Sequence, residues 1–176
     1  MDYAIELYGI ISLYFTGNKA RVVCMTNLLI GLLRASSTNL CKVACNMPGD
    51  IKIMSKYRRL QRFFAEVQLE CDQLTAFIIN QISMDAKYIV ILDRTNWKFG
   101  TVDINFLVLS IAWHGISIPI YWVNLARAGN SNIEERMQIL SKMIRLLGVD
   151  KIEALLADRE FIGEDCLHWL DHYITY

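Results

Sequence analysis

Residues 88–97 read YIVILDRTNW, and residues 155–163 read LLADREFIG. In each stretch an apolar run ends at an aspartate, Asp93 or Asp158, and an arginine follows directly. Short apolar runs of this kind predict buried strands. If the two strands are parallel neighbours, both carboxylates emerge at the same edge of one sheet. Open α/β sheets bind ligands at the carboxyl-terminal edge, so the two stretches together predict a carboxylate site.

The second half of the chain alternates between strand and helix patterns. The expected elements are strands over 87–92, 105–113 and 118–125, a helix from about 131 to 147, a strand over 153–157 and a helix over 163–173. Ser131 and Glu134 have the spacing of a capping box, and Gly148 is suited to end the first of these helices. Asp93 would close the first strand and Asp158 the fourth. The predicted fold class is α/β.

The first half of the chain has helical patterns. The predicted helices span 1–17, 21–34, about 55–64 and 70–82. Residues 47–50, Met-Pro-Gly-Asp, break the chain between them. The pattern changes near Asp85, so we expect a helical region over 1–84 and a strand-containing domain over 85–176.

Composition indicates a folded protein with an uneven distribution of charge. Hydrophobic residues make up 54% of the 176, and there are only two prolines, which excludes a disordered composition. The net charge of zero combines +4 in residues 1–70 with −4 in residues 71–176. A basic first half suggests an anionic partner for that region.

Two features bear on the compartment. The five cysteines are odd in number and form no CxxC, and no secretory signal begins the chain, so we expect reduced thiols in a cytoplasmic protein. Residues 104–125 lack charged side chains and could be read as a membrane span. His114, Gly115 and Pro119 interrupt this run, and two buried strands joined by a turn at 114–117 explain it better. No membrane partner is therefore expected.

Two neighbouring aspartates favour metal chemistry. Carboxylates held close together repel each other unless a cation neutralises them. Mg²⁺ prefers oxygen ligands, a few from protein and the others from water or phosphate, and paired ions of this kind promote phosphodiester chemistry. The alternative is that each aspartate only stabilises the turn that follows it.

Four motifs carry a resemblance to a known family. They are ILDRTNWKFG at 91–100, IPIYW at 118–122, GNSNIEER at 129–136 and LLADREFIG at 155–163. In this order they resemble the DDE transposases of bacterial insertion sequences, from about Tyr57 to the last residue. The resemblance implies a ribonuclease H-like fold, Mg²⁺ or Mn²⁺ as cofactor, DNA as substrate, and a homodimeric synaptic complex. It makes Asp93 and Asp158 the first two catalytic and metal-binding carboxylates.

The sequence departs from the family at the third carboxylate. That residue is a glutamate in a Tyr-Arg-Glu-Lys pattern, which the 176 residues do not contain. Glu160 and Glu164 stand too close to Asp158 to replace it. We therefore expect the N-terminal part of a transposase, a truncated or split copy, with an incomplete ribonuclease H-like fold of the order β-β-β-α-β-α.

Basic residues supply candidate DNA contacts. Lys52, Lys56, Arg58, Arg59 and Arg62 fall in a stretch without acidic residues, and such clusters bind phosphates without sequence preference. The predicted DNA-binding residues are Arg58, Arg59, Arg62, Arg94, Asn96, Trp97 and Lys98. Trp97 could stack on a base or belong to the core. The runner-up function is a non-catalytic DNA-binding protein or inhibitor of transposition.

Three further patterns point weakly to other chemistry. The Asp-x-Thr after the first strand is similar to aspartyl-phosphate phosphatases, but Thr95 stands where those enzymes carry a second aspartate. His168 and His172 have the i, i+4 spacing of zinc ligands and lack an evident third ligand. Cys41 and Cys45 share that spacing, and a two-thiolate metal site is not expected from them.

Overall fold

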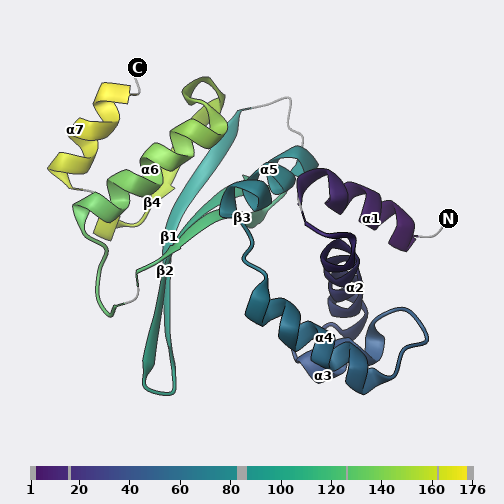
Figure 1. The fold of residues 1–176 in the computed structure, drawn as a ribbon. Coiled ribbons are helices and arrows are strands. Elements are labelled where there is room, and N and C mark those ends of the chain that lie inside the picture. Colours follow the sequence, from purple (N-terminus) through teal and green to yellow (C-terminus); the bar gives the residue numbers. More distant parts are fainter. Residues whose placement is uncertain (1–2, 16, 83–86, 126, 162, 174–176) are drawn as a thin grey trace. The chain divides into compact units, whose positions relative to one another are not determined.

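The chain divides into two compact units, Met1–Gln73 and Leu74–Tyr176 (Figure 1). This computed structural model describes residues 3–15, 17–82, 87–125, 127–161 and 163–173. The boundary predicted at 84/85 lies one helix later than this division, because the helix at Cys71–Ile82 packs on the sheet. Its Ile82 belongs to the core of the second unit, and its Thr75 hydroxyl donates a hydrogen bond to the carbonyl of Ile120.

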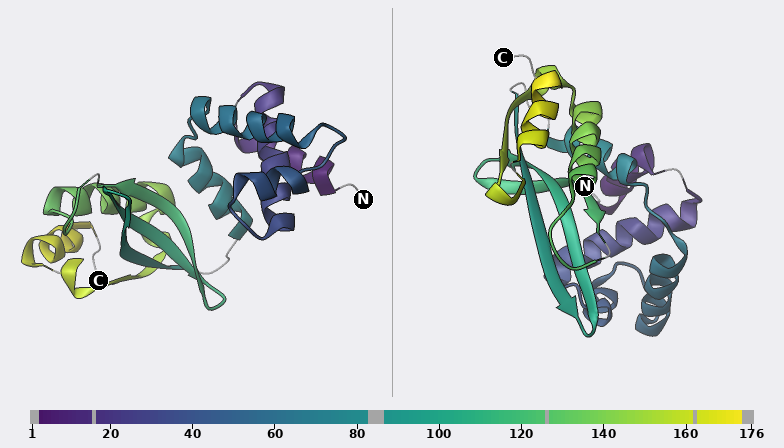
Figure 2. Two further views of the ribbon diagram at one scale, coloured as in Figure 1. Left: turned by 90° about the horizontal axis from the view of Figure 1, so that it is seen from below. Right: turned by 90° about the vertical axis from the view of Figure 1, so that its left-hand side faces the viewer.

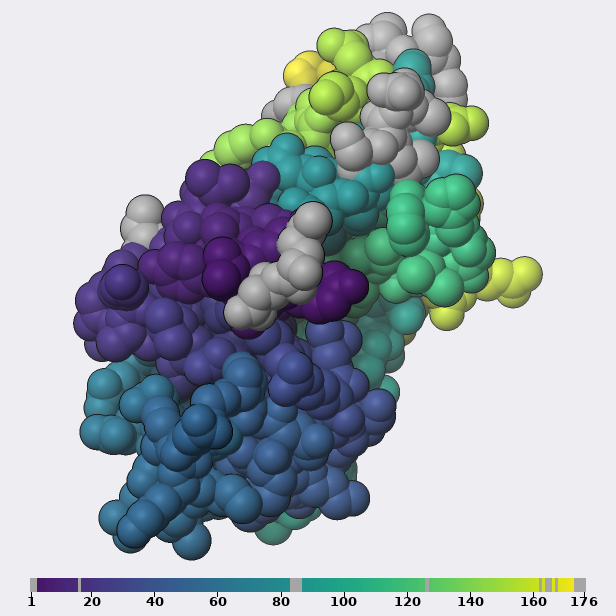
Figure 3. All heavy atoms as spheres, turned by 90° about the vertical axis from the view of Figure 1, so that its right-hand side faces the viewer, coloured from purple at the N-terminus to yellow at the C-terminus, as the bar shows by residue number. Residues whose placement is uncertain are grey.

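The first unit consists of helices. They are α1 (Tyr3–Tyr14), α2 (Lys19–Ala35), α3 (Leu40–Asn46) and α4 (Ile53–Glu66). Ile11, Val43 and Leu60 are fully buried and form its core. Figure 3 shows the side chains of these helices closely packed on one face of the unit. The helices predicted over 1–17, 21–34 and 55–64 are confirmed in type and approximate position.

Two details of the first unit differ from prediction. The short helix α3 was not predicted, and its first turn is stabilised by Asn39, whose side chain accepts from the amides of Cys41 and Lys42. The sequence predicted that α4 begins at about residue 55. The helix begins two residues earlier, at Ile53, and its N-terminus has no side-chain cap.

The second unit has the predicted α/β order. After α5 (Cys71–Ile82) its main elements are β1 (Tyr88–Phe99), β2 (Val102–Trp113), β3 (Ile116–Asn124), α6 (Ile133–Leu147), β4 (Ile152–Ala157) and α7 (Glu164–Tyr173). Short 3-10 helices precede and follow β4 at Val149–Lys151 (η1) and Arg159–Phe161 (η2). The uncharged stretch 104–125 forms β2 and β3, as predicted.

The strands form one mixed sheet in the order β3-β2-β1-β4. The β1–β2 and β2–β3 pairs are antiparallel, and the β1–β4 pair is parallel. The condition set by the sequence, that the two strands preceding Asp93 and Asp158 are parallel neighbours, is confirmed.

The two faces of the sheet differ. Alternate residues of β1 and β2, such as Leu92 and Leu109, are buried against Leu140 and Met143 of α6. Figure 2 shows α6 and α7 together on this side of the sheet. Because successive side chains of a strand point to opposite faces, Asp93 lies on the other face.

β1 is longer than predicted. It was expected to end at Leu92, so that Asp93 would close it, but the strand continues to Phe99 and pairs with β2 throughout. The extension lacks the apolar run that predicted the strand, and cross-strand pairing stabilises it instead. The ring of Trp97 lies 5.8 Å from that of Phe106. We call the antiparallel segment formed by residues 94–107 the hairpin arm (Figure 1).

The N-terminus of α6 is one residue later than predicted. The capping box consists of Asn132 and Glu135, in place of Ser131 and Glu134. The Ser131 hydroxyl is buried and accepts a hydrogen bond from Nε of Arg136, 2.9 Å away, so it is not available as a cap. Gly148 ends the helix with a φ of 80°, as predicted.

None of the helices in the described ranges combines the length and the apolar character that a membrane span requires. Helices α2 and α3 reach that length and apolar character only when taken together, and the chain bends by 100° between them.

Candidate functional site

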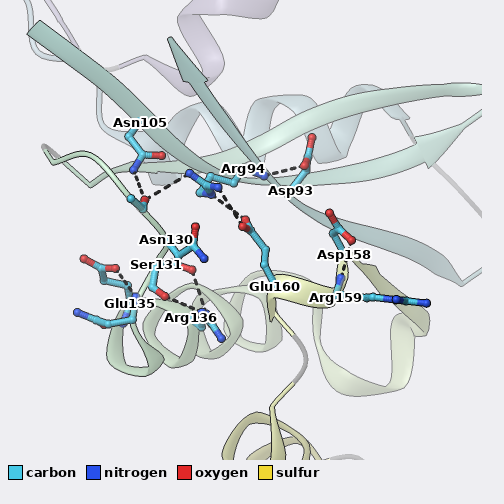
Figure 4. A network of polar contacts seen from close by, with 12 residues as sticks. Asp93, Arg94, Asn105, Asn130, Ser131, Glu135, Arg136, Asp158, Arg159 and Glu160 are labelled. Atoms are coloured by element: carbon cyan, nitrogen blue, oxygen red, sulfur yellow. Dashed lines mark hydrogen bonds and ion pairs between the residues drawn. The ribbon is translucent and has the colours of Figure 1, made fainter. Parts of the chain in front are cut away.

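The register of β1 and β4 places the two aspartates side by side. Leu92 and Ala157 are the last residues paired in the parallel ladder, and the next residue of each chain is Asp93 or Asp158. Both aspartates are exposed. Figure 4 shows their carboxylates on neighbouring segments at this edge of the sheet. The structure thus places the predicted carboxylates on neighbouring segments, and their joint role as a site stays a prediction.

Each carboxylate is held in the same way. Oδ1 of Asp93 accepts a hydrogen bond from the amide of Arg94 at 2.7 Å, and Oδ1 of Asp158 accepts one from the amide of Arg159 at 2.6 Å. The main-chain carbonyl of Asp158 also accepts from the amide of Phe161, which starts η2. The turn-stabilising role that the sequence left open applies to Asp158, which η2 follows, whereas Asp93 lies inside β1 and no turn follows it. The other oxygen of each carboxylate has no protein partner among the described residues.

Two neighbouring carboxylates are a partial donor set for a divalent cation. Among the described residues, no three His, Cys, Asp or Glu side chains come close enough to form a complete metal site. Mg²⁺ commonly binds through one or two carboxylates and completes its coordination with water and phosphate oxygens. Asp93 and Asp158 offer that donor set, whereas His168 with His172, or Cys41 with Cys45, gains no third ligand from the described part of the chain.

An ion pair joins the segments that carry the two aspartates. Nε and Nη2 of Arg94 donate to the two carboxylate oxygens of Glu160, at 2.7 and 2.9 Å (Figure 4). The side chains are only 16% and 21% exposed. The hydrogen bond to Glu160 is the main reason why the pKa of Arg94 is raised. Glu160, which the sequence excluded as the third carboxylate, is thus engaged elsewhere.

The loop before α6 is tied to the same network. Nη1 of Arg94 donates to the carbonyl of Gly129 at 3.3 Å, and Nδ2 of Asn105 donates to that carbonyl at 2.9 Å. Asn105 also donates to the carbonyl of Arg127 and is 1% exposed. The GNSN segment of the third motif is therefore fixed against the hairpin arm.

The DNA contacts predicted near the site occupy different environments. Asn96, Trp97 and Lys98 lie on the hairpin arm and are exposed, Trp97 at 48%. Trp97 is therefore not a core residue. The Lys98 side chain is 75% exposed and 3.8 Å from Asp103. Arg94, by contrast, is committed to Glu160 and Gly129, and a DNA contact by it stays a prediction.

A hollow of about 620 Å³ lies beside Asp93 on the face of the sheet opposite α6. Its lining is largely apolar and includes Thr95, Trp97, Phe106, Val108 and Trp122. An extended ligand with flat apolar parts, such as an unpaired nucleotide, would find stacking surfaces next to the carboxylate.

A second hollow, of about 640 Å³, lies between α2 and α4 in the first unit. Its cationic lining residues are Lys19, Arg21, Arg59 and Arg62. No ion pair or side-chain hydrogen bond engages these four cations in the described residues, and Glu66 is the acidic residue of the lining. We call this hollow the basic groove. Arg58 is exposed on α4 outside it.

Sequence reasoning missed several members of these sites. Lys19 and Arg21 are far from the basic stretch in sequence and meet it only because α2 packs beside α4. Arg159 is exposed next to Asp158, and the repeated Asp-Arg pair was a signal for it. Lys56 belonged to the basic stretch but is buried, and its ammonium donates to the carbonyl of Met47.

No family model, curated protein or solved structure matches this chain. Its function is therefore inferred from the geometry of its own residues and from the four motifs.

Proposed function

We propose that the chain belongs to the machinery of DNA transposition and carries two of the three carboxylates of a DDE-type active site. The observation that supports this most is the parallel register, which sets Asp93 beside Asp158. The motif resemblance requires such an arrangement, and the sequence alone did not fix it. The ribonuclease H-like fold is part of the same proposal, and the mixed sheet with a helical layer is compatible with it.

The roles of the residues follow from their placement. The free oxygens of Asp93 and Asp158 would hold Mg²⁺ or Mn²⁺. A cation there supplies Lewis-acid activation of the attacking oxygen and neutralises charge at the scissile phosphate. Trp97, Asn96 and Lys98 would hold the DNA strand against the hollow next to Asp93. Strand cleavage also needs the third carboxylate. We therefore assign strand cleavage to an assembly in which another segment or chain supplies that carboxylate.

The test is divalent-cation binding, measured by titration calorimetry with Mn²⁺ and by the loss of its free-ion electron paramagnetic resonance signal. Asp93→Asn and Asp158→Asn should each weaken Mn²⁺ binding by about tenfold or more, since even indirect changes at metal sites cost roughly 10–100-fold. Asp150→Asn is the matched control, because Asp150 is exposed at the opposite end of β4. Equal Mn²⁺ affinity in all four proteins would refute the metal site.

A second candidate function is DNA binding without catalysis, and the basic groove favours it. Four cations without ion-pair partners among the described residues and one carboxylate give the groove a net positive charge. The guanidinium groups of Arg59 and Arg62 also act on the pKa of the Cys24 thiol, lowering it against the larger effect of burial. Both arginines line the groove together with Cys24, where a phosphodiester backbone could reach them.

The salt dependence of DNA binding tests this second function. Replacing Arg59 and Arg62 with Gln should reduce affinity for a duplex of arbitrary sequence, and should lower the slope of log K against log salt by about 0.9 for each phosphate that is no longer neutralised. Arg34→Gln is the control, because Arg34 is exposed in the last turn of α2 and lies outside the groove. Binding that is unaffected by the double change would exclude the groove. Binding that survives in Asp93→Asn shows that it is independent of the carboxylates.

A further inference from the structure

The Arg94–Glu160 ion pair lies just beyond the last backbone pairing between β1 and β4, the strands that lead to Asp93 and Asp158. Parallel hydrogen bonding between β1 and β4 ends at Leu92 and Ala157, one residue before the aspartates. Beyond it, β1 continues into the hairpin arm and β4 gives way to η2. The register brings Asp93 and Asp158 alongside each other, and contacts formed after the ladder adjust their separation.

The ion pair is placed to supply such a contact. Arg94 follows Asp93 directly, and Glu160 is two residues after Asp158. The paired hydrogen bonds of 2.7 and 2.9 Å use the planar fork of the guanidinium, which fixes orientation as well as distance. Because alternate side chains of a strand point to opposite faces, Arg94 holds η2 from the helical side and leaves Asp93 free on the other.

Other contacts hold Arg94 and the segment that carries Glu160 in place. Arg94 is fixed by the carbonyl of Gly129. On the η2 side, Phe161 is buried, and the guanidinium of Arg136 lies 5.8 Å from its ring centroid. These contacts anchor Arg94 to the loop before α6 and the Glu160 side to the buried Phe161. The pair therefore resists the mutual repulsion that drives two neighbouring carboxylates apart.

We propose that Arg94 and Glu160 are a positioning pair that fixes the separation of Asp93 and Asp158 and so prepares the site for a divalent cation. The cation part of this inference rests on the proposed function. Glu160 acts through geometry and is not a ligand, since both of its oxygens accept from Arg94. Residues around metal ligands affect affinity through orientation in this way.

The first experiment needs no metal. Amide hydrogen exchange, followed by NMR, reports on the amides of Arg159 and Phe161, which bond to Asp158. Glu160→Gln and Arg94→Lys should speed their exchange several-fold while circular dichroism and the melting temperature show a folded protein. Glu135→Gln is the control, because the Arg127–Glu135 pair has the same 2.7 Å length and lies at the N-terminus of α6. Unchanged exchange in the folded variants would overturn the positioning role.

The second experiment is Mn²⁺ titration of the same proteins. Glu160→Gln and Arg94→Lys should bind Mn²⁺ about 10–100-fold more weakly than the unchanged chain, and Glu135→Gln should bind it normally. The double exchange Arg94→Glu with Glu160→Arg should recover part of the affinity, which distinguishes a pairwise contact from a general effect of charge. Equal weakening in Glu160→Gln and Glu135→Gln would overturn the proposal.

The two failures can be told apart. If the unchanged chain binds no Mn²⁺, the proposed metal site is wrong, and the exchange data still decide whether the pair positions the aspartates. If Mn²⁺ binds but neither readout responds to Glu160→Gln, the site stands and the positioning role is wrong. If Glu160→Gln does not fold, Arg94→Lys, which keeps the charge and removes the fork, takes its place in both comparisons.

Discussion

Leu92 and Ala157 face each other as the last pair of the parallel ladder, and each is followed by an aspartate and an arginine. In both motifs one carboxylate oxygen accepts a hydrogen bond from the next amide, and the other has no protein partner among the described residues. A structural aspartate would need only that hydrogen bond. The repetition on adjacent strands is what makes the pair a candidate site.

Neutralising Asp93 should not destabilise the metal-free protein. Like charges at neighbouring positions of a sheet are unfavourable by roughly 0.2–1 kcal/mol, so Asp93→Asn in a chelating buffer should leave the free energy of unfolding unchanged or raise it by a few tenths. Added Mn²⁺ should raise the melting temperature of the unchanged chain and not of the variant, because a ligand stabilises only the state that binds it. A decrease of more than about 1 kcal/mol in chelator would identify Asp93 as a structural residue.

Trp97 should contribute to binding of single-stranded DNA. Its ring is half exposed in the hollow beside Asp93, and stacking of a base on an aromatic ring contributes about 1–3 kcal/mol. Trp97→Ala should weaken binding of a short oligonucleotide accordingly, as measured by fluorescence anisotropy of a labelled strand. Val102→Ala is the control, because Val102 is 60% exposed on the same arm and carries no ring. Equal affinity of all three proteins would count against a stacking role.

Much of the fold could be predicted because it depends on local patterns. The apolar runs before Asp93 and Asp158 identified β1 and β4, and Gly148 identified the end of α6. The hairpin arm could not be predicted in this way, since the polar second half of β1 is stabilised by pairing with β2. Likewise, the cap of α6 is Asn132 in place of Ser131, whose hydroxyl accepts a hydrogen bond from Arg136, a contact that local spacing does not contain.

The site could be predicted only in part for the same reason. Both aspartates could be identified from the sequence. Their proximity depended on the two strands being parallel neighbours, which the sequence alone does not determine. The partner of Arg94 was not visible, because Glu160 is 66 residues away along the chain. Of the basic groove, only Arg59 and Arg62 were predicted from the sequence. The residues that α2 contributes depend on the packing of α2 beside α4.

Two helical glycines should respond in opposite directions to replacement by alanine. At Gly31 of α2, an added methyl group would lie 2.9 Å from Cγ1 of Val43 and 3.0 Å from its carbonyl oxygen. Gly31→Ala should therefore lower the free energy of unfolding by about 1–3 kcal/mol through overpacking. At Gly9 of α1, nothing lies within 4 Å, and Gly9→Ala should raise it by about 0.5–1 kcal/mol. Urea denaturation measures both, and a neutral Gly31→Ala would contradict the close packing of α2 and α3.

The cysteines should fall into two classes of reactivity. Cys41 and Cys45 are exposed on α3, whereas Cys24 and Cys166 are buried. Burial raises the pKa of both buried thiols above the ordinary value of 9.0, against a smaller lowering by nearby arginines. Since the thiolate is the reactive form, a maleimide at about pH 7.5 should label Cys41 and Cys45 first in peptide mass spectrometry. Early labelling of Cys24 would contradict its burial in the first unit.

The same shifts give a pH dependence of stability. A raised thiol pKa in the folded state means that the unfolded state ionises first as the pH rises past 9, and the folded state then holds more protons. The stability contribution is complete below pH 9 and is lost as the pH approaches the folded pKa values, so the free energy of unfolding should fall in alkaline buffer. Cys24→Ser with Cys166→Ser should flatten this decline. Replacing Arg59 and Arg62 with Gln should steepen it, because both arginines lower the pKa of Cys24. An unchanged alkaline slope in the arginine variant would mean that these guanidinium groups do not act on the Cys24 thiol.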